Sequence, residues 1–547
     1  MKKKLVTVLL TCSMVASLLS ACGNEDDSSS KKDKTEDVDE EDEDDDKGKN
    51  KDKDKEVAKA EPKSVLEGTL WEDEPWTFDP WVWSGVEEDP WTQNPEPELP
   101  SEPTTPEPGP GDAWDGSTLW IDPATGRPYD LGGMEIIVRD WWSNPDAVPW
   151  NDYEEARAEY IDYLEETYNF TITQMAISDW GSAPADFVDY VTTGGDDVNY
   201  IFTLRDDPAT ISAMRNGLMY DLSTLDCLDF SDDKFQVNRV HEQYEYGGDI
   251  CCMYAGYSEP RTGMYFNKRL LEEAGIDPES IYDMQKDGTW TWEAWTEIMS
   301  KVQRDINGDG VIDIYGFDAN YSLPVYAAVY SNGSEFVGRE NGKYVYKYED
   351  IATVQALVFM ADTLAYYGVQ RPSGAQWDYY KQAFLNGECA FMPEDAYCAA
   401  EGGWITYEMT DEIGFVMFPK GPNATDYTNC WTNNYVAIPA CYDADRAWKI
   451  AFAYDLYTDD VPGYEGFVDF SQYRNGAFDF RAIDETICMM ISKGMVTYHG
   501  MIPSLDMGEP FLWKFVGGSL GQRVTDVWAI IDSVRDTYKS YIDAANR

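Results

Sequence analysis

The stretch that decides the fold is GMEIIVR at residues 133–139, an apolar run with branched side chains. Such a run, bounded by glycine in front and by the polar and aromatic DWW at 140–142, predicts a β-strand. Residues 153–168 (YEEARAEYIDYLEETY) follow with apolar and aromatic side chains at helical spacing. The region therefore begins with a strand that leads into an amphipathic helix.

The same alternation continues along the next part of the chain. Residues 170–175 alternate like a second strand, 187–191 fit a short helix, and 197–202 predict a third strand that ends at Arg205-Asp206-Asp207. Strands that alternate with helices pair in parallel, which predicts an α/β fold. Ligands of such sheets bind in the loops at the carboxyl ends of the strands.

Length and charge restrict the function further. The chain has 547 residues, which exceeds one ordinary core and predicts two lobes. It carries 42 Lys and Arg against 102 Asp and Glu, a formal charge of −60. Such a surface repels phosphate backbones, so we expect no nucleic-acid partner. The charge favours neutral or cationic ligands.

The beginning of the chain predicts export and a lipid anchor. Lys2, Lys3 and Lys4 precede an apolar run at 5–19, which is too short to cross about 30 Å of hydrocarbon and is typical of a signal peptide. Leu19-Ser20-Ala21-Cys22 resembles a bacterial lipobox, whose cysteine carries acyl chains such as palmitate. The alternative is an ordinary cleavage site with an incidental cysteine. We expect residues 1–21 to be removed and Cys22 to be held at the outer face of the cell membrane.

Residues 22–130 are predicted to be a disordered linker. The acidic stretch 23–63 has too few apolar side chains to form a core. The stretch 95–111 (PEPELPSEPTTPEPGPG) favours polyproline II. Five tryptophans lie at 71–91, at a spacing that suits neither helix nor strand. This segment is either a plain linker or a docking segment.

The number and spacing of the cysteines and histidines leave few residues for a catalytic or metal site. Ten cysteines occur, and eight remain once Cys12 leaves with the signal peptide and Cys22 is lipidated. Outside the cell these can form disulfides, but their partners cannot be assigned from sequence. The chain has no C-x-x-C pair and only two histidines, so a zinc site or a Ser-His or Cys-His nucleophile has few residues to use.

Several segments between residues 216 and 449 resemble those of a known family in order and spacing. They are NGLMYDL at 216–222, MYFNKRLLEEAGI at 264–276, TWEAW at 291–295, AFLNGECAFM at 383–392, IGFVMFPKGP at 413–422, YVAI at 435–438 and DRAWK at 445–449. Together they resemble the extracellular solute-binding proteins of ABC importers, in the carbohydrate-type branch whose best-known members bind maltodextrins. The resemblance covers about 131–547.

This resemblance implies a two-lobed periplasmic-binding-protein-like fold with a ligand cleft between lobes that hinge segments join. The family's chain order places the first lobe at 131–262 and 430–475, and the second at 263–429 and 476–547. It further implies a monomeric receptor that captures a small solute, most simply an oligosaccharide, and delivers it to permease subunits. Such a receptor needs no cofactor and is no enzyme.

One loop has the pattern of a calcium site. The stretch DINGDGVID at 305–313 places oxygen ligands at alternate positions, as in an EF-hand loop. The expected ligands are Asp305, Asn307, Asp309, Val311 and Asp313. The twelfth position holds Gly316 instead of the usual glutamate, so the alternative is a solvated turn. A calcium ion here would be structural.

Position in the implied topology selects the ligand-binding candidates. A sugar presents flat apolar faces ringed by hydroxyls, so its site needs aromatic platforms and planar polar groups. The chain has 20 Trp and 37 Tyr, so any one of these residues can equally be packed in the core instead of binding a ligand. The candidates are Trp141, Trp142, Asp206, Tyr257, Glu259, Tyr265, Glu394, Asp395, Trp404, Trp431 and Asn433.

Two other functions stay open at this stage. A surface glycan hydrolase would use a pair of carboxylates at a defined separation, but no pair at the strand ends stands out. A calcium-binding adhesin would use the tryptophan-rich segment. Glycoside turnover would favour the first, and calcium-dependent attachment the second. The acidic chain also allows a cationic solute such as a peptide or a polyamine.

Overall fold

The computed structural model describes residues 119–320, 322–429, 434–502 and 526–547, together with residues 505, 511, 515 and 519. All of them belong to one compact unit, Glu96–Arg547. None of the helices in these ranges is long and apolar enough to cross a bilayer. The predictions for residues 1–118, including the signal peptide, Cys22 and most of the linker, lie outside the described residues. Residues 119–130, which the disordered-linker prediction included, instead form a short hairpin in which Ile121–Asp122 pairs with Arg127–Pro128, and Tyr129 packs on Trp448.

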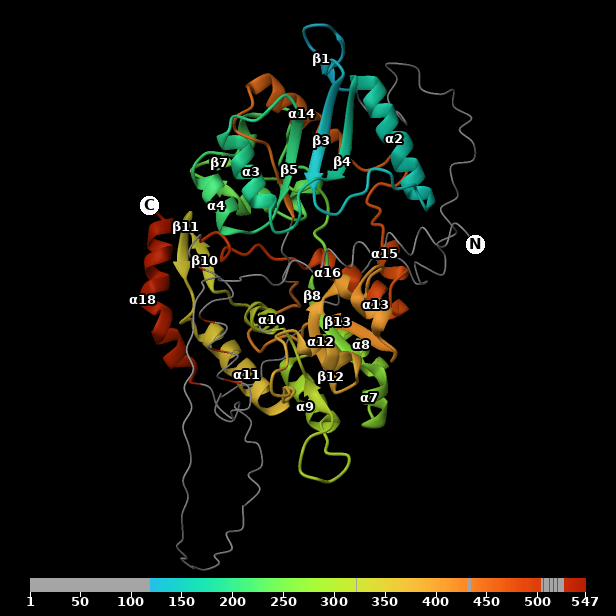
Figure 1. Cartoon of the computed structure of the whole chain (residues 1–547), viewed down its shortest axis with the longest axis vertical. Helices are drawn as coiled ribbons and strands as arrows, with labels where there is room; N and C mark the ends of the chain where they lie inside the picture. Colours follow the sequence, from blue (N-terminus) through green and yellow to red (C-terminus); the bar gives the residue numbers. More distant parts are fainter. Residues whose placement is uncertain are drawn as a thin grey trace, which may run out of the picture. The chain divides into compact units, whose positions relative to one another are not determined.

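A first four-stranded sheet has the order β14-β5-β3-β4 (Figure 1). Its strands are β3 (Met134–Asp140), β4 (Phe170–Ala176), β5 (Asn199–Leu204) and β14 (Tyr435–Ala437). Strand β3 pairs in parallel with both β4 and β5, whereas β14 pairs antiparallel with β5. The predicted alternation of parallel strands and helices is therefore confirmed for this region.

Helices α2 (Asp152–Tyr168) and α14 (Ala444–Tyr457) pack on this sheet (Figure 1). Helix α2 begins where the Asn151 side chain accepts a hydrogen bond from the Glu154 N–H, and it ends at Asn169 in the left-handed conformation with φ 55°. Its buried face meets the buried face of α14 in one hydrophobic core. The other helices of the region are α3 (Ala183–Thr192), α4 (Pro208–Arg215), η2 (Leu222–Thr224), α5 (Asp233–Gln236) and α6 (Val240–Gln243).

A second four-stranded sheet has the order β13-β8-β12-β9. Its strands are β8 (Thr262–Asn267), β9 (Tyr315–Phe317), β12 (Cys389–Asp395) and β13 (Ile413–Met417). Strand β8 is antiparallel to β12 and β13, and β9 is parallel to β12. Strand β12 extends through Glu394 and Asp395, two of the ligand-binding candidates.

The second sheet is packed tightly. Every residue of β8 and of β13 is buried. A Cβ atom at Gly414 would lie 2.0 Å from the ring of Phe266, so only glycine fits at that position. The helices around this sheet are α7 (Lys268–Glu273), α8 (Glu279–Lys286), α9 (Trp292–Val302), α10 (Leu323–Ser331), α11 (Ile351–Tyr367), α12 (Tyr379–Leu385), η3 (Ala396–Ala399) and α13 (Trp404–Glu408).

The remaining elements are short, apart from the last helix. Helix α18 packs against α11 and against the hairpin of β10 and β11. The bounds are β1 (Ile121–Asp122), β2 (Arg127–Pro128), β6 (Glu245–Tyr246), β7 (Asp249–Ile250), β10 (Val337–Glu340), β11 (Lys343–Tyr346), α15 (Ser471–Arg474), η4 (Ala482–Ile487), α16 (Cys488–Ser492) and α18 (Val527–Ala545). Elements η4 and α16 adjoin each other, and η4 packs on β13.

The sequence left disulfide pairing open. The seven cysteines in the described ranges are all free thiols: Cys227, Cys251, Cys252, Cys389, Cys398, Cys441 and Cys488. Burial raises the pKa of each thiol, for example to about 12 at Cys227 and to about 11 at Cys488. These cysteines therefore behave as small apolar core residues rather than as reactive groups. Cys430 lies outside the described residues.

Candidate functional site

A cavity of about 590 Å³ lies at the carboxyl end of the parallel strands of the first sheet. Val138 of β3, Gln174 of β4 and Thr203 of β5 each contribute to its wall. This is the end of an α/β sheet at which ligands bind. The volume falls within the range typical of small-molecule sites, and we call this space the main cavity.

Aromatic side chains form much of the wall of the main cavity. They are Trp142, Tyr254, Tyr257, Tyr454, Tyr457, Phe470 and Tyr473. Trp142 and Tyr257 are 46% and 42% exposed, so their rings have free surface that a ligand can cover. Flat apolar rings together with a few polar groups suit a ligand that has both apolar faces and hydroxyl groups.

Three stretches of the wall belong to segments that connect the two sheets. The wall includes most of 254–260, which leads into β8, and also Asn434, which precedes β14. The third stretch, 468–473, precedes the η4 and α16 helices, and Ile491 of α16 also reaches the cavity. A molecule bound here would contact all three connections at once.

An ion-pair cluster adjoins the cavity at the start of β8. Arg261 lies 2.9 Å from a carboxylate oxygen of Glu259, which lines the cavity, and 3.8 Å from a carboxylate oxygen of Asp395 in β12. Burial raises the pKa of Glu259, and the guanidinium of Arg261 offsets part of that rise. Arg261 therefore holds a cavity carboxylate and a carboxylate of the second sheet together.

Glu394, next to Asp395, is a buried acid. It is 4% exposed and accepts hydrogen bonds from the Tyr380 hydroxyl at 2.7 Å and from the Asp395 N–H at 3.0 Å. Burial raises the pKa of Glu394 to about 7, and burial also raises the pKa of Asp395. Removal from water disfavours the charged form of each carboxyl.

Two further charged residues line the main cavity. Arg157 of α2 stacks on the ring of Tyr457, with its guanidinium carbon 4.8 Å from the ring centroid. Asp469 accepts hydrogen bonds from the Asn151 side-chain amide at 3.1 Å and from the Ser471 N–H at 2.8 Å. The carboxylate of Asp469 is thus engaged in holding its own loop against the start of α2.

Of the predicted ligand-binding residues, Trp142, Tyr257 and Glu259 line the main cavity. Trp141 packs edge to face on Trp142, with ring centroids 5.0 Å apart, so it supports the wall from behind. Asp395 reaches the same region through Arg261. The structure therefore brings these five predicted residues to one place.

Other predicted residues lie in the core. Tyr265 is fully buried, packs on Phe415 and donates hydrogen bonds to the carbonyl oxygens of Asp395 and Ala396. Asp206 accepts a hydrogen bond from the Tyr244 hydroxyl, and burial raises the pKa of its carboxyl. Neither residue, nor Glu394, is part of the cavity wall. Each satisfies polar groups inside the fold, which is the alternative that sequence could not separate from binding.

Trp404 begins α13 and has the Lys381 ammonium 5.7 Å from its ring centroid, but it is not part of the cavity wall. Trp431 and Asn433 lie outside the described residues. Their neighbour Asn434 does line the cavity. The ligand-binding roles of the predicted set stay predictions.

The predicted calcium loop is exposed and closes on itself. The Asp305 carboxylate accepts hydrogen bonds from the Gly308 and Gly310 N–H groups, each at 2.7 Å. The Asp313 carboxylate accepts from the Ile306 N–H at 2.7 Å. In the described ranges no group of three or more His, Cys, Asp or Glu side chains is arranged to hold a metal ion. Calcium binding here stays a prediction.

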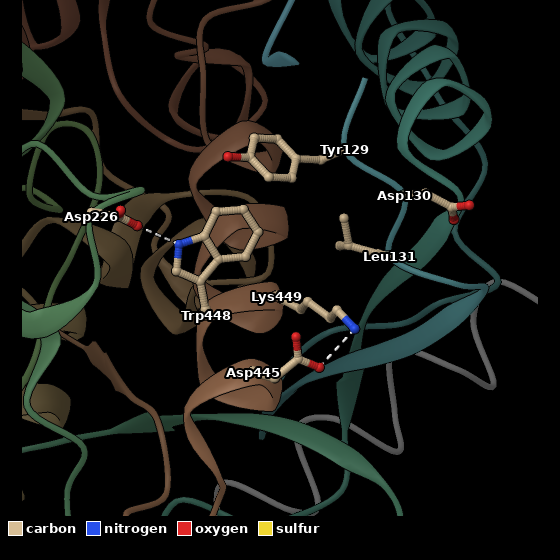
Figure 2. A pocket seen from close by; sticks show the side chains of 7 residues that line it. All are labelled: Tyr129, Asp130, Leu131, Asp226, Asp445, Trp448 and Lys449. Atoms are coloured by element: carbon tan, nitrogen blue, oxygen red, sulfur yellow. Dashed lines mark hydrogen bonds and ion pairs between the residues drawn. The ribbon is translucent and has the colours of Figure 1, made fainter. Parts of the chain in front are cut away.

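A second, smaller cavity of about 250 Å³ lies beside α14 (Figure 2). Its polar side chains already have partners: the Trp448 indole N–H donates to Asp226 at 2.6 Å, and the Lys449 ammonium lies 2.8 Å from Asp445 (Figure 2). Tyr129 packs on Trp448 with ring centroids 4.9 Å apart. The larger cavity is thus the better candidate for a ligand.

Sequence reasoning missed Arg157, Tyr454, Tyr457 and Asp469. The sequence did contain one signal, because Arg157 is the only basic residue in the otherwise acidic helix 153–168. The two tyrosines stand three residues apart and share a helix face, but that spacing is equally typical of core residues. Asp469 follows no strand, so topology could not select it.

Comparison with known proteins adds independent findings. A family model described as bacterial extracellular solute-binding protein matches residues 171–451. A search of curated proteins gave no match.

Among solved structures, the cyclic alpha-maltosyl-1,6-maltose binding protein from Arthrobacter globiformis is 13% identical, with a TM-score of 0.51 over 75% of this chain and 99% of that one. UgpB from Mycobacterium tuberculosis, in complex with glycerophosphocholine, is 16% identical, with a TM-score of 0.48 over 76% of this chain and 99% of that one. A cyclo/maltodextrin-binding protein complexed with maltotetraose is 14% identical, with a TM-score of 0.48 over 75% and 99%.

These findings confirm the α/β periplasmic-binding-protein-like fold that the sequence predicted. The matched family binds solutes and is not enzymatic, which confirms the prediction that the chain is no enzyme and removes the glycan hydrolase. The predicted lobe boundaries stay a prediction.

Proposed function

The chain belongs to the bacterial extracellular solute-binding proteins, and from this premise we propose that it captures an oligosaccharide in the main cavity and delivers it to the permease of an ABC importer. The observation that carries the proposal is the composition of the cavity wall. Aromatic rings from the loop after β3, from α14 and from the connecting segments surround a space large enough for several sugar rings. Exposed Trp142 and Tyr257 supply the platforms on which sugar faces stack.

The position of the cavity supports coupling between capture and closure. The wall includes residues from 254–260, Asn434 and 468–473, which all connect the two sheets. A solute that touches these connections binds more tightly to one arrangement of the two sheets than to the other. A ligand shifts a conformational equilibrium only through such differential contacts. The closed form would then be the one that the permease accepts.

The lipid anchor forms the second part of the proposal. Leu19-Ser20-Ala21-Cys22 resembles a lipobox, and the acidic and proline-rich stretch to about residue 130 has the composition of a tether. We propose that lipidated Cys22 holds the receptor at the outer face of the cell membrane, near its permease. Growth in labelled palmitate tests this: the wild type should take up label and Cys22→Ser should not. Labelled C22S would contradict the anchor.

The solute proposal is tested by titration calorimetry of the full chain against a panel of oligosaccharides, with peptides and polyamines as the competing classes. Selective, saturable binding of a saccharide is expected. The variants Trp142→Ala and Tyr257→Ala should each weaken it by about tenfold or more, since each removes an aromatic contact.

Trp528→Ala is the matched control, because Trp528 is also 49% exposed but lies on α18 and outside the cavity wall. Equal losses in all three variants would overturn the assignment of the cavity. Binding of peptides or polyamines without any saccharide would overturn the solute class.

A further inference from the structure

The main cavity contains one positively charged side chain. Of the Lys, Arg and His residues in the described ranges, only Arg157 lines its wall. The guanidinium is half-buried, because it stacks on the Tyr457 ring at 4.8 Å and donates to the Tyr457 carbonyl oxygen at 3.5 Å. That hydrogen bond is at the outer limit of length. Arg157 is therefore held by its contacts with tyrosines rather than by an ion pair with a described acid.

Arg157 differs from most arginines of this protein in having no carboxylate partner. Ten arginines in the described ranges form ion pairs with Asp or Glu. Arg157 forms none with any acid that the structure describes, although the chain has 102 acids for 42 bases. Burial alone would lower the pKa of Arg157, but the phenols of Tyr457 and Tyr153 raise it, so the group stays charged.

The acids of the cavity wall are already occupied. The Glu259 carboxylate pairs with Arg261 at 2.9 Å, and the Asp469 carboxylate accepts hydrogen bonds from the Asn151 side-chain amide at the start of α2 and from the Ser471 N–H. No described carboxylate forms an ion pair with the guanidinium of Arg157, because Glu259 is paired with Arg261 and Asp469 is directed toward Asn151 and Ser471. A half-buried cation in an aromatic cavity is stabilised by an anion that enters with the ligand.

We propose that the solute is an acidic oligosaccharide and that Arg157 binds the carboxylate of one of its uronic acid rings. The inference rests on the proposed function, since it assigns a chemical class to the solute of the same cavity. The planar guanidinium matches a carboxylate through two parallel N–H···O bonds, which Lys cannot reproduce. The Tyr457 ring lies against this guanidinium, with 4.8 Å between the ring centroid and the central guanidinium carbon.

The test compares ligands that differ in charge alone. Oligogalacturonides, oligoglucuronides and oligomannuronides are titrated against the full chain, each beside its methyl ester and the corresponding neutral oligosaccharide. A uronate should bind about ten- to a hundredfold more tightly than its own ester, the range expected for hydrogen bonds to a charged group. In Arg157→Gln this preference should vanish, and Arg157→Lys should restore only part of it.

Arg446→Gln is the matched control, because Arg446 also binds carbonyl oxygens, stacks on a tyrosine and lies outside the cavity wall. It should keep the full preference for the uronate. If R157Q does not fold, the comparison of acid and ester on the wild type decides the question by itself.

The outcomes separate the two proposals. Tight binding of a neutral oligosaccharide with no gain from the carboxylate overturns the acidic solute but supports the receptor. A preference for sulfated over uronic saccharides overturns the uronate assignment. Preference that persists in R157Q overturns the role of Arg157. If no saccharide binds, the proposed function itself fails.

Discussion

The two sheets differ in what they contribute to the main cavity. The first sheet places Val138, Gln174 and Thr203 at the wall, beside aromatic side chains of α14 and of the connections. The second sheet contributes no strand residue to that wall in the described ranges. Its β8 and β13 are buried throughout, and Gly263 and Gly414 in these strands are packed against aromatic rings.

This difference indicates that the first sheet serves ligand binding and that the second sheet serves the stability of the fold. Polar and aromatic groups with free surface gather at the open end of the first sheet, where a solute can replace water. In the second sheet, close packing leaves no room for a ligand, and the buried groups serve the fold. We therefore expect changes in the first region to alter affinity, and changes in the second to alter the free energy of unfolding.

The largest effect is expected at Arg261, which links the two regions through its ion pairs with Glu259 of the cavity wall and Asp395 of β12. Arg261→Gln leaves the Glu259 and Asp395 carboxylates without their shared cation, so unfolding should become easier by about 3–5 kcal/mol. Affinity for the solute should also fall, because Glu259 lines the cavity. Urea unfolding measures the loss of stability, and calorimetry measures the loss of affinity.

Arg269→Gln is the control, because the ion pairs of Arg269 are more exposed. It should lower the free energy of unfolding by less than about 1 kcal/mol and leave affinity for the solute unchanged. Loss of stability in R261Q without any loss of affinity would break the proposed link.

A change in the second sheet should affect stability alone. Gly414→Ala places a methyl group 2.0 Å from the Phe266 ring and should cost about 3 kcal/mol in urea unfolding. Phe266→Leu in the same chain should recover part of that loss, because it makes room for the methyl group. Solute affinity of the folded G414A fraction should equal that of the wild type. A changed affinity would show that the second sheet takes part in binding.

Glu394 predicts a pH dependence with a defined sign. Its pKa is about 7 in the folded protein and lower in the unfolded chain, so the folded state binds the proton more tightly. Stability from this group is therefore full at about pH 4 and is lost as pH rises toward and beyond about 7. Glu394→Gln should remove this loss. The free energy of unfolding of E394Q, measured relative to the wild type, should therefore be about 2–3 kcal/mol larger at pH 8 than at pH 4.

The pH series of thermal or urea unfolding compares E394Q with Glu166→Gln, an exposed position on α2. E166Q should follow the wild type at every pH. An E394Q profile parallel to that of the wild type would mean that the pKa of Glu394 is the same in the folded and the unfolded protein, which would contradict the prediction.

The smallest effect is expected at the loop 305–313. We propose that it holds a structural calcium ion, in which case calcium should raise the melting temperature by a few degrees relative to EDTA. The double variant Asp305→Asn and Asp309→Asn should lose that shift. Solute affinity should be the same with calcium and with EDTA, because the loop lies outside the cavity wall. An affinity that depends on calcium would instead favour a functional ion.

Sequence patterns predicted local structure better than they predicted the site. The predicted strand at 133–139 and the predicted helix at 153–168 correspond to β3 and α2. Each of these local elements depends mainly on residues that are neighbours in the sequence. Tyr265 and Tyr257 are both tyrosines near the first connection, yet one is core and the other lines the cavity. Burial depends on residues far away in sequence, so local pattern could not separate them.

The sequence by itself determined the alternation of strands and helices and the family, because these are written in consecutive residues. Only the tertiary structure decided which side chains meet. Arg157 and Tyr457 stand 300 residues apart, and they touch because α14 returns to the face of the sheet that α2 covers. Close packing of separate segments sets that contact, and no spacing along the chain encodes it.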